Sequence, residues 1–225
     1  MGLINWFNSG GIFMWPILIL LIVGIALAIE RIVSFKANYH VKNKFFQRLR
    51  AMVKDGRIRE AYNSCLTTSH PLAKVVAAVL YNANKSKEVI ESASDIEVQK
   101  VLPGIQARTT YINMIANVST LIGLLGTIQG LIASFASLSE ASGAEKAELL
   151  AQGISTAMNT TMFGLIVAIP CIMLYTFITQ MEDKTLKKYD EIISEMVHLV
   201  VHKPHSETVN SDTQFKEFDG FKKHG

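Results

Sequence analysis

Residues 109–139 read TTYINMIANVSTLIGLLGTIQGLIASFASLS and contain no Asp, Glu, Lys or Arg. The same is true of residues 1–29 and of residues 149–181, so three windows of about 30 residues are uncharged. Charged residues make up 18% of the 225-residue chain and lie in the segments between these windows and after the third. Soluble domains do not normally leave such gaps, whereas a transmembrane helix needs about 20 mainly apolar residues. The sequence therefore predicts an integral membrane protein with three helical spans.

The distribution of charge also predicts how the spans are oriented. Residues 31–113 carry 14 Lys and Arg against 6 Asp and Glu, whereas residues 140–148 carry one Lys against three Glu. Because Lys and Arg accumulate in cytoplasmic loops, we expect the N-terminus outside and the C-terminus inside. The net charge of +3 then reflects topology and gives no indication of nucleic-acid binding. A cleaved signal peptide is disfavoured because no Lys or Arg precedes the first apolar run.

The second and third uncharged windows are longer than one bilayer crossing requires. Their 31 and 33 residues would extend roughly 45–50 Å as helix, against a hydrocarbon thickness of about 30 Å. We expect these two helices to tilt or to project beyond the membrane. On the basic side they should extend into a helical domain.

Apolar residues at helical spacing predict three short helices over residues 43–53, 57–66 and 71–83. A fourth helix should start near Ser86 and run into the second span, with a kink at Pro103-Gly104. No stretch alternates with a period of two, so no sheet is expected. The predicted fold class is an all-α membrane protein.

Residues typical of catalysis or of metal binding are scarce. Cys65 and Cys171 are isolated and are interpreted as packing residues. His198 and His202 have a spacing that can hold a metal ion, but the further ligands are missing. There is no phosphate-binding loop and no nucleophile elbow. We therefore expect neither an enzyme nor a bound metal or cofactor.

Polar and small residues recur in the second and third uncharged windows. Asn113, Thr120, Thr127 and Ser134 repeat every seven residues and share a helical face with several glycines. The candidates for close helix packing are Gly123, Gly126, Gly130, Gly153 and Gly164. In the third window, Gly153, Thr160 and Gly164 lie on one stripe of small residues, which Thr161 borders. Thr156 and Asn159 form a polar line beside that stripe. These residues alone fit two readings equally: a packed oligomer interface or a hydrated ion path.

Two motifs extend the interpretation: LIGLLGTIQGL at residues 121–131 and GISTAMNTTMFGLIVAIP at residues 153–170. With their order and the three-span layout, they resemble the TolQ/ExbB/MotA family of ion-driven motor subunits. The similarity is closest to the ExbB and TolQ branch and covers about residues 10–200. It implies a pore lined by Thr127 and Thr161. Many relatives carry a glutamate where this chain has Thr156.

The resemblance implies a homopentamer in a bacterial inner membrane, enclosing the single-span helices of two ExbD/TolR-like subunits. Their aspartate would take up and release the ion, and a TonB/TolA-like protein would receive the work. This chain has no acidic residue in its spans except Glu30 at one edge, so proton transport needs a partner carboxylate. The further ion-path candidates are Thr120, Thr156, Asn159 and Thr160.

Two alternatives accompany this interpretation. The neutral oxygens of Thr156, Asn159, Thr160 and Thr161 are compatible with sodium, although protons are favoured because hydroxyls alone do not identify a metal ion. A passive oligomeric membrane scaffold without ion conduction would explain the small-residue faces by packing alone.

The expected organisation has eight segments. They are 1–11 (periplasmic), 12–34 (first transmembrane helix), 35–112 (cytoplasmic helical domain), 113–138 (second transmembrane helix), 139–149 (periplasmic loop), 150–180 (third transmembrane helix), 181–201 (cytoplasmic helix) and 202–225 (mobile tail).

Overall fold

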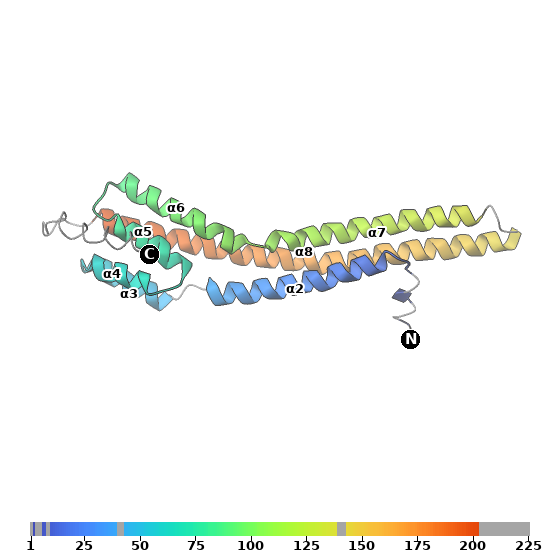
Figure 1. Cartoon of the computed structure of the whole chain (residues 1–225), viewed down its shortest axis with the longest axis horizontal. Helices are drawn as coiled ribbons and strands as arrows, with labels where there is room; N and C mark the ends of the chain where they lie inside the picture. Colours follow the sequence, from blue (N-terminus) through green and yellow to red (C-terminus); the bar gives the residue numbers. More distant parts are fainter. Residues whose placement is uncertain (1, 3–5, 8–9, 40–42, 139–142, 203–225) are drawn as a thin grey trace, which may run out of the picture.

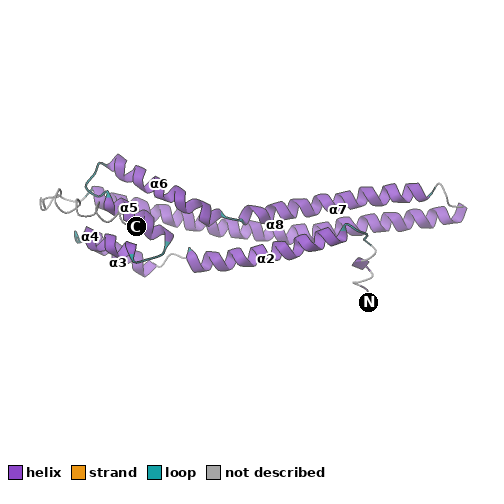
Figure 2. Ribbon diagram, in the orientation of Figure 1, coloured by secondary structure: helices purple, strands orange, loops and turns teal. Residues whose placement is uncertain are grey.

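Three long helices pack together at one end of an elongated molecule: α2 (Met14–Asn38), α7 (Thr109–Ser137) and the first part of α8 (Gly143–Val201) (Figure 1). The structure is a computed structural model and describes residues 2, 6–7, 10–39, 43–138 and 143–202. Over this part of the chain Figure 2 shows helices joined by loops and turns, without a strand. The predicted all-α class is confirmed.

The three predicted spans are also confirmed, because the chain has three helices long and apolar enough to cross a membrane. With 29 residues, α7 extends about 43 Å, which exceeds the hydrocarbon core of about 30 Å. The hairpin of α7 and α8 reaches past the N-terminal end of α2 (Figure 1). The orientation, N-out and C-in, stays a prediction.

The third span and the helix expected after it are one uninterrupted helix, α8, of 59 residues. Pro170 lies inside it and removes one backbone donor, so the Ile166 carbonyl loses its usual partner. A single proline of this kind is tolerated in a membrane helix when neighbouring groups compensate. Residues 143–181 of α8, with α2 and α7, are called the membrane arm below.

The other end of α8 belongs to a second region, the short-helix arm, which consists of residues 182–201 and four further helices. These are α3 (Asn43–Lys54), α4 (Ile58–Leu66), α5 (Pro71–Tyr81) and α6 (Lys87–Gln106). The first three coincide with the predicted short helices to within two residues. Gly56, at φ +87°, occupies the turn between α3 and α4, where a residue with a Cβ would be strained. The His70 ring accepts a hydrogen bond from the Leu72 amide and caps α5.

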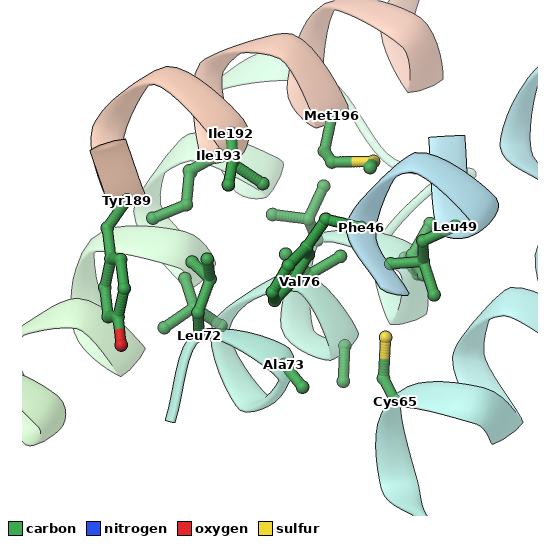
Figure 3. Packing of buried hydrophobic residues seen from close by; sticks show 14 of the residues in the cluster. Phe46, Leu49, Cys65, Leu72, Ala73, Val76, Tyr189, Ile192, Ile193 and Met196 are labelled. Atoms are coloured by element: carbon green, nitrogen blue, oxygen red, sulfur yellow. The ribbon is translucent and has the colours of Figure 1, made fainter. Parts of the chain in front are cut away.

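The core of the short-helix arm forms around α5, the most buried of its helices. Figure 3 shows Leu72, Ala73 and Val76 of α5 in one cluster with side chains of α8, α3 and α4. Its largest fully buried side chain is Phe46 of α3. Residues of α8 complete the cluster: Tyr189, Ile192, Ile193, Met196, Val197 and Val200. The last turns of α8 are thus anchored by apolar contacts. Burial in this core also raises the pKa of the Tyr189 phenol above its ordinary value.

The junction between α6 and α7 differs from the prediction. A continuous helix with a kink at Pro103-Gly104 was expected, but α6 continues through Pro103 and ends at Gln106. Ala107 and Arg108 then form a non-helical joint, and Arg108 has a left-handed backbone with φ 62°. The prediction failed because a side chain distant in sequence, Arg31 of α2, donates to the Ile105 carbonyl oxygen at this joint. The second span is therefore interrupted where it leaves the membrane arm, while the third is not.

Candidate functional site

The two helices of the α7–α8 hairpin touch along their small residues. The facing sets, in order along the contact, are Gly164 with Ser119 and Gly123, Thr161 with Gly123, Thr160 with Gly126, Ala157 with Gly130, and Gly153 with Ser134. All five glycines named as packing candidates lie in this row of contacts. The contacts join two helices of one chain, so the glycines close its own hairpin.

The backbones in this row approach too closely for larger side chains. A Cβ atom on Gly164 would lie 2.7 Å from the Ser119 carbonyl oxygen. A Cβ atom on Gly130 would lie 2.8 Å from the Cβ of Ala157. Because lipid supplies little hydrophobic drive between helices, such close packing is a main source of hairpin stability.

Thr161 and Thr127 lie at the edge of the hairpin contact. The Thr161 hydroxyl donates a hydrogen bond to the Gly123 carbonyl oxygen on α7 at 2.8 Å. Thr127, one turn beyond Gly123, donates to the Leu124 carbonyl oxygen of its own helix at 2.6 Å. Both side chains are half-buried. Each hydroxyl oxygen keeps lone pairs that can accept a further hydrogen bond.

A polar line on α7 extends from this edge. Asn113 and Thr127 are half-buried, and Thr120 between them is exposed. The Thr120 hydroxyl donates to the Ala116 carbonyl oxygen at 3.1 Å, which satisfies its proton within the helix. These three members of the seven-residue repeat therefore present polar atoms that α8 of the same chain does not fully cover, whereas the fourth, Ser134, is buried against Gly153 of α8.

The remaining ion-path candidates contact the N-terminal segment of the chain. The Asn159 amide oxygen accepts a hydrogen bond from the Trp6 indole at 3.1 Å. Thr160 is fully buried and donates to the carbonyl oxygens of Gly10 and Thr156. The half-buried Thr156 donates to the Gln152 carbonyl oxygen at 3.0 Å. The six predicted residues thus divide into two groups, one along the α7 edge and one beside Trp6, Gly10 and Gly11.

A buried charged cluster joins the three long helices, and the sequence interpretation missed it. Arg31 of α2 contacts Glu182 of α8 at 3.0 Å and the hydroxyl of Thr109, the first residue of α7, at 3.2 Å. All three residues are at most 4% exposed. Each lies within two residues of a boundary of an uncharged window, which could have indicated that the three lie at a similar depth in the membrane. The contacts among them could not be predicted from the sequence because they join residues that are far apart along the chain.

No three His, Cys, Asp or Glu residues within the described ranges are grouped so that they could hold a metal ion. The rings of His198 and His202 stack with centroids 4.2 Å apart. The apolar spans and neutral hydroxyls provide groups for helix packing and for hydrogen bonding to water or a partner helix. They provide no constellation for bond-breaking chemistry.

Comparison with known proteins agrees with this architecture. The family model described as the MotA/TolQ/ExbB proton channel family matches residues 42–191, two thirds of the chain. Biopolymer transport protein exbB1 of Vibrio cholerae is 26% identical over 82% of both chains. A putative ExbB homolog of Methanothermobacter thermautotrophicus is 26% identical over 87% of this chain and 69% of its own length. The Tol-Pal system protein TolQ of Haemophilus influenzae is 29% identical over 48% of this chain and 47% of its own.

Members of this family are transport proteins without enzymatic activity, and the predicted resemblance is confirmed. The three apolar helices, the uncharged hairpin with its threonines and the match over residues 42–191 lead to one conclusion. This multi-pass membrane protein belongs to the MotA/TolQ/ExbB proton channel family.

Proposed function

We propose that the chain is the channel-forming subunit of a proton-driven motor in a bacterial inner membrane. Five copies surround the membrane helices of two ExbD/TolR-like subunits. Proton flow along the interface drives movement of one component relative to the other. A TonB/TolA-like partner carries the work onward.

The observation that carries this proposal is the polar edge of an otherwise apolar hairpin. Thr127 and Thr161 are half-buried beside the glycine contact and keep oxygen lone pairs for water or a partner. Pure packing would favour covering these hydroxyls completely, because an uncovered polar group in hydrocarbon is costly. A second, polar or hydrated component against this edge would remove that cost.

The hairpin itself has no carboxylate in its uncharged windows that could carry a proton, since residues 109–139 and 149–181 contain no Asp or Glu. A carboxylate on another subunit would therefore supply the proton-carrying group that the hairpin lacks. An aspartate on a single-span partner helix would alternate between its charged and neutral forms, and the threonine edge would hydrate the charged form.

The geometry favours protons over sodium. A sodium site needs several oxygen ligands turned toward one point. Among the candidates, the Asn159 oxygen accepts from Trp6, Thr160 lies against Gly10, and Thr161 lies against Gly123 of α7, so their oxygens face different neighbours. A hydrated threonine edge facing a partner carboxylate does not require such convergence.

The test replaces threonine by valine at residue 127 and, separately, at residue 161. Valine keeps the branched shape and removes the hydroxyl. Proton influx would be measured in liposomes containing the chain with its single-span partner. Loss of one hydrogen bond, about 1 kcal/mol, corresponds to a decrease of about fivefold. We expect decreases of this size or larger, with the pentamer intact by native mass spectrometry.

Thr176→Val is the matched control, because Thr176 lies exposed on α8 and donates only to the Ile172 carbonyl oxygen of its own helix. It should leave proton influx unchanged. Thr161→Ser should retain most of the influx because the hydroxyl remains. Normal influx in both valine variants would contradict the proposal and favour a passive scaffold.

A further inference from the structure

The buried cluster at the α6–α7 joint is more elaborate than an ion pair. The Arg31 guanidinium donates to three acceptors: Glu182 Oε1 at 3.0 Å, Thr109 Oγ1 at 3.2 Å and the Ile105 carbonyl oxygen. The Thr109 hydroxyl in turn donates to the same Glu182 oxygen. One side chain from α2 thereby connects the end of α6, the start of α7 and the middle of α8.

The Ile105 carbonyl explains why a guanidinium is needed at this place. In a continuous helix this carbonyl would accept from the amide of Thr109, but the helix breaks at Ala107 and Arg108. An unpaired carbonyl buried near the membrane is costly. Arg31 satisfies it from outside the helix, and only a planar fork can reach this carbonyl and two further acceptors together.

The joint itself is strained, and a second contact holds its other side. Arg108 adopts a left-handed backbone that residues with a Cβ rarely occupy. Its guanidinium pairs with Glu30, the residue before Arg31. Two consecutive residues of α2 therefore hold the two sides of the break. Strained backbone persists where surrounding contacts determine it.

We propose that Arg31, Glu182 and Thr109 form a lock that fixes the α6–α7 joint and so sets the direction in which α7 leaves it. The three are positioning residues: they keep the polar edge of α7 at a fixed angle to the short-helix arm. The effect on ion flow rests on the proposed function, whereas the effect on the joint does not. A buried ion pair is weak support for a purely stabilising role, since apolar replacements of a pair often fold equally well.

The experiment separates locking from stability with the double variant Arg31→Leu with Glu182→Leu in the full chain, assembled with its partner. Removing both charges leaves no unpaired ion but also leaves the Ile105 carbonyl and the Thr109 hydroxyl without the guanidinium. Amide hydrogen exchange of peptides covering residues 105–112 would be followed by mass spectrometry. We expect intact oligomers, exchange faster by about tenfold or more, and proton influx reduced about fivefold or more.

Arg31→Lys is the second variant, in case the double variant does not assemble. It keeps the charge beside Glu182 but cannot present a fork to three acceptors, so exchange should again accelerate. The control is Glu97→Gln, which breaks the exposed pair of Glu97 and Lys100 on α6. Exchange at the joint should then stay within about twofold of the unmodified chain.

Each outcome tests whether the cluster locks the joint and whether that lock positions α7. Unchanged exchange in both the double variant and Arg31→Lys would overturn it. Faster exchange with normal influx, in a preparation where Thr127→Val blocks influx, would overturn its positioning role. If neither Thr127→Val nor Thr161→Val lowers influx, the proposed function fails, and exchange alone decides whether the joint is locked.

Discussion

The threonines of the membrane arm show how one residue type serves different roles according to its partner. Thr120 and Thr176 donate to carbonyl oxygens of their own helices, which is the ordinary arrangement of membrane threonines. Thr161 instead reaches across to α7, and Thr160 reaches the backbone of Gly10. The sequence identified these residues as a polar group, but their separation into two groups depends on tertiary contacts.

Cys65 allows a prediction about the core of the short-helix arm. Burial raises the pKa of its thiol from 9.0 to about 12. At pH 8, below both values, the reactive thiolate is therefore about a thousandfold scarcer than in an exposed cysteine. We expect iodoacetamide to modify Cys65 at least a hundredfold more slowly, on the order of that scarcity, than a cysteine introduced by Asn63→Cys, an exposed position on the same helix. Modification sites would be identified by mass spectrometry, and equal rates would contradict the packing of α4.

At the scale of elements, three helices are held together in two different ways. The hairpin of α7 and α8 closes on glycines, whereas α2 contacts both helices mainly through apolar side chains such as Ile17 and Ala28. Close backbone packing tolerates no added volume, but side-chain packing can be adjusted. The hairpin should consequently be the more sensitive of the two contacts.

The contact between α2 and α8 can be trapped by a disulfide. A Cβ atom on Gly24 would lie 3.1 Å from the Cys171 sulfur, close to the separation of about 3 Å that disulfide geometry implies. Gly24→Cys should form an intramolecular disulfide with Cys171 when a membrane-permeant oxidant is added. The crosslinked peptides would be detected by mass spectrometry. Ile25→Cys, at a position 45% exposed on the same helix, should not crosslink; equal yields in both variants would refute this packing.

Gly164→Ala tests the glycine contact. The obstacle to a methyl group is the Ser119 carbonyl oxygen at 2.7 Å, and backbone cannot move aside as a flexible side chain can. Overpacking of this kind costs about 1–3 kcal/mol, so the oligomer in detergent should lose its fold at a lower temperature. Gly143→Ala, where nothing lies within 4 Å of the added atom, is the control. An unchanged melting temperature for Gly164→Ala would mean that the helices are farther apart.

Sequence patterns were sufficient for the three spans and the short helices, because periodicity and the absence of charge report local requirements. They were insufficient at the α6–α7 joint. Pro103 is the obvious local signal for a kink, yet the break lies at Ala107 and Arg108, where Arg31 provides the missing backbone partner. They also missed the contact of Trp6 with Asn159, since nothing near either residue indicates the other.

The whole molecule consists of two arms with different connections between them. On one side α8 continues without interruption from the membrane arm into the core around α5. On the other side the chain passes through the joint at residues 107–108. One connection is a continuous helix and the other depends on the charged cluster. Loss of that cluster would therefore be expected to permit movement between the arms at the joint, with α8 as the fixed reference.

The driving ion is a property of the whole assembly, and it can be tested directly. We expect energised output to persist when sodium is replaced by potassium while a proton gradient is maintained. Output should cease when a protonophore is added while a sodium gradient is maintained, because the threonine edge lacks a convergent set of oxygen ligands. The measurement is growth or motility dependent on the motor. The reverse pattern would establish sodium as the driving ion.

The continuity of α8 also constrains its length. Ile178 packs in the membrane arm, and Tyr189 packs in the core around α5. The helix between them is continuous, so no loop can compensate for a rotation of one part relative to the other. One inserted residue would rotate everything after it by about 100° and advance it by about 1.5 Å. Tyr189 would then leave the core while Ile178 remained in place. Over this stretch the spacing of residues is itself a structural quantity, and substitutions are tolerated far more readily than insertions or deletions.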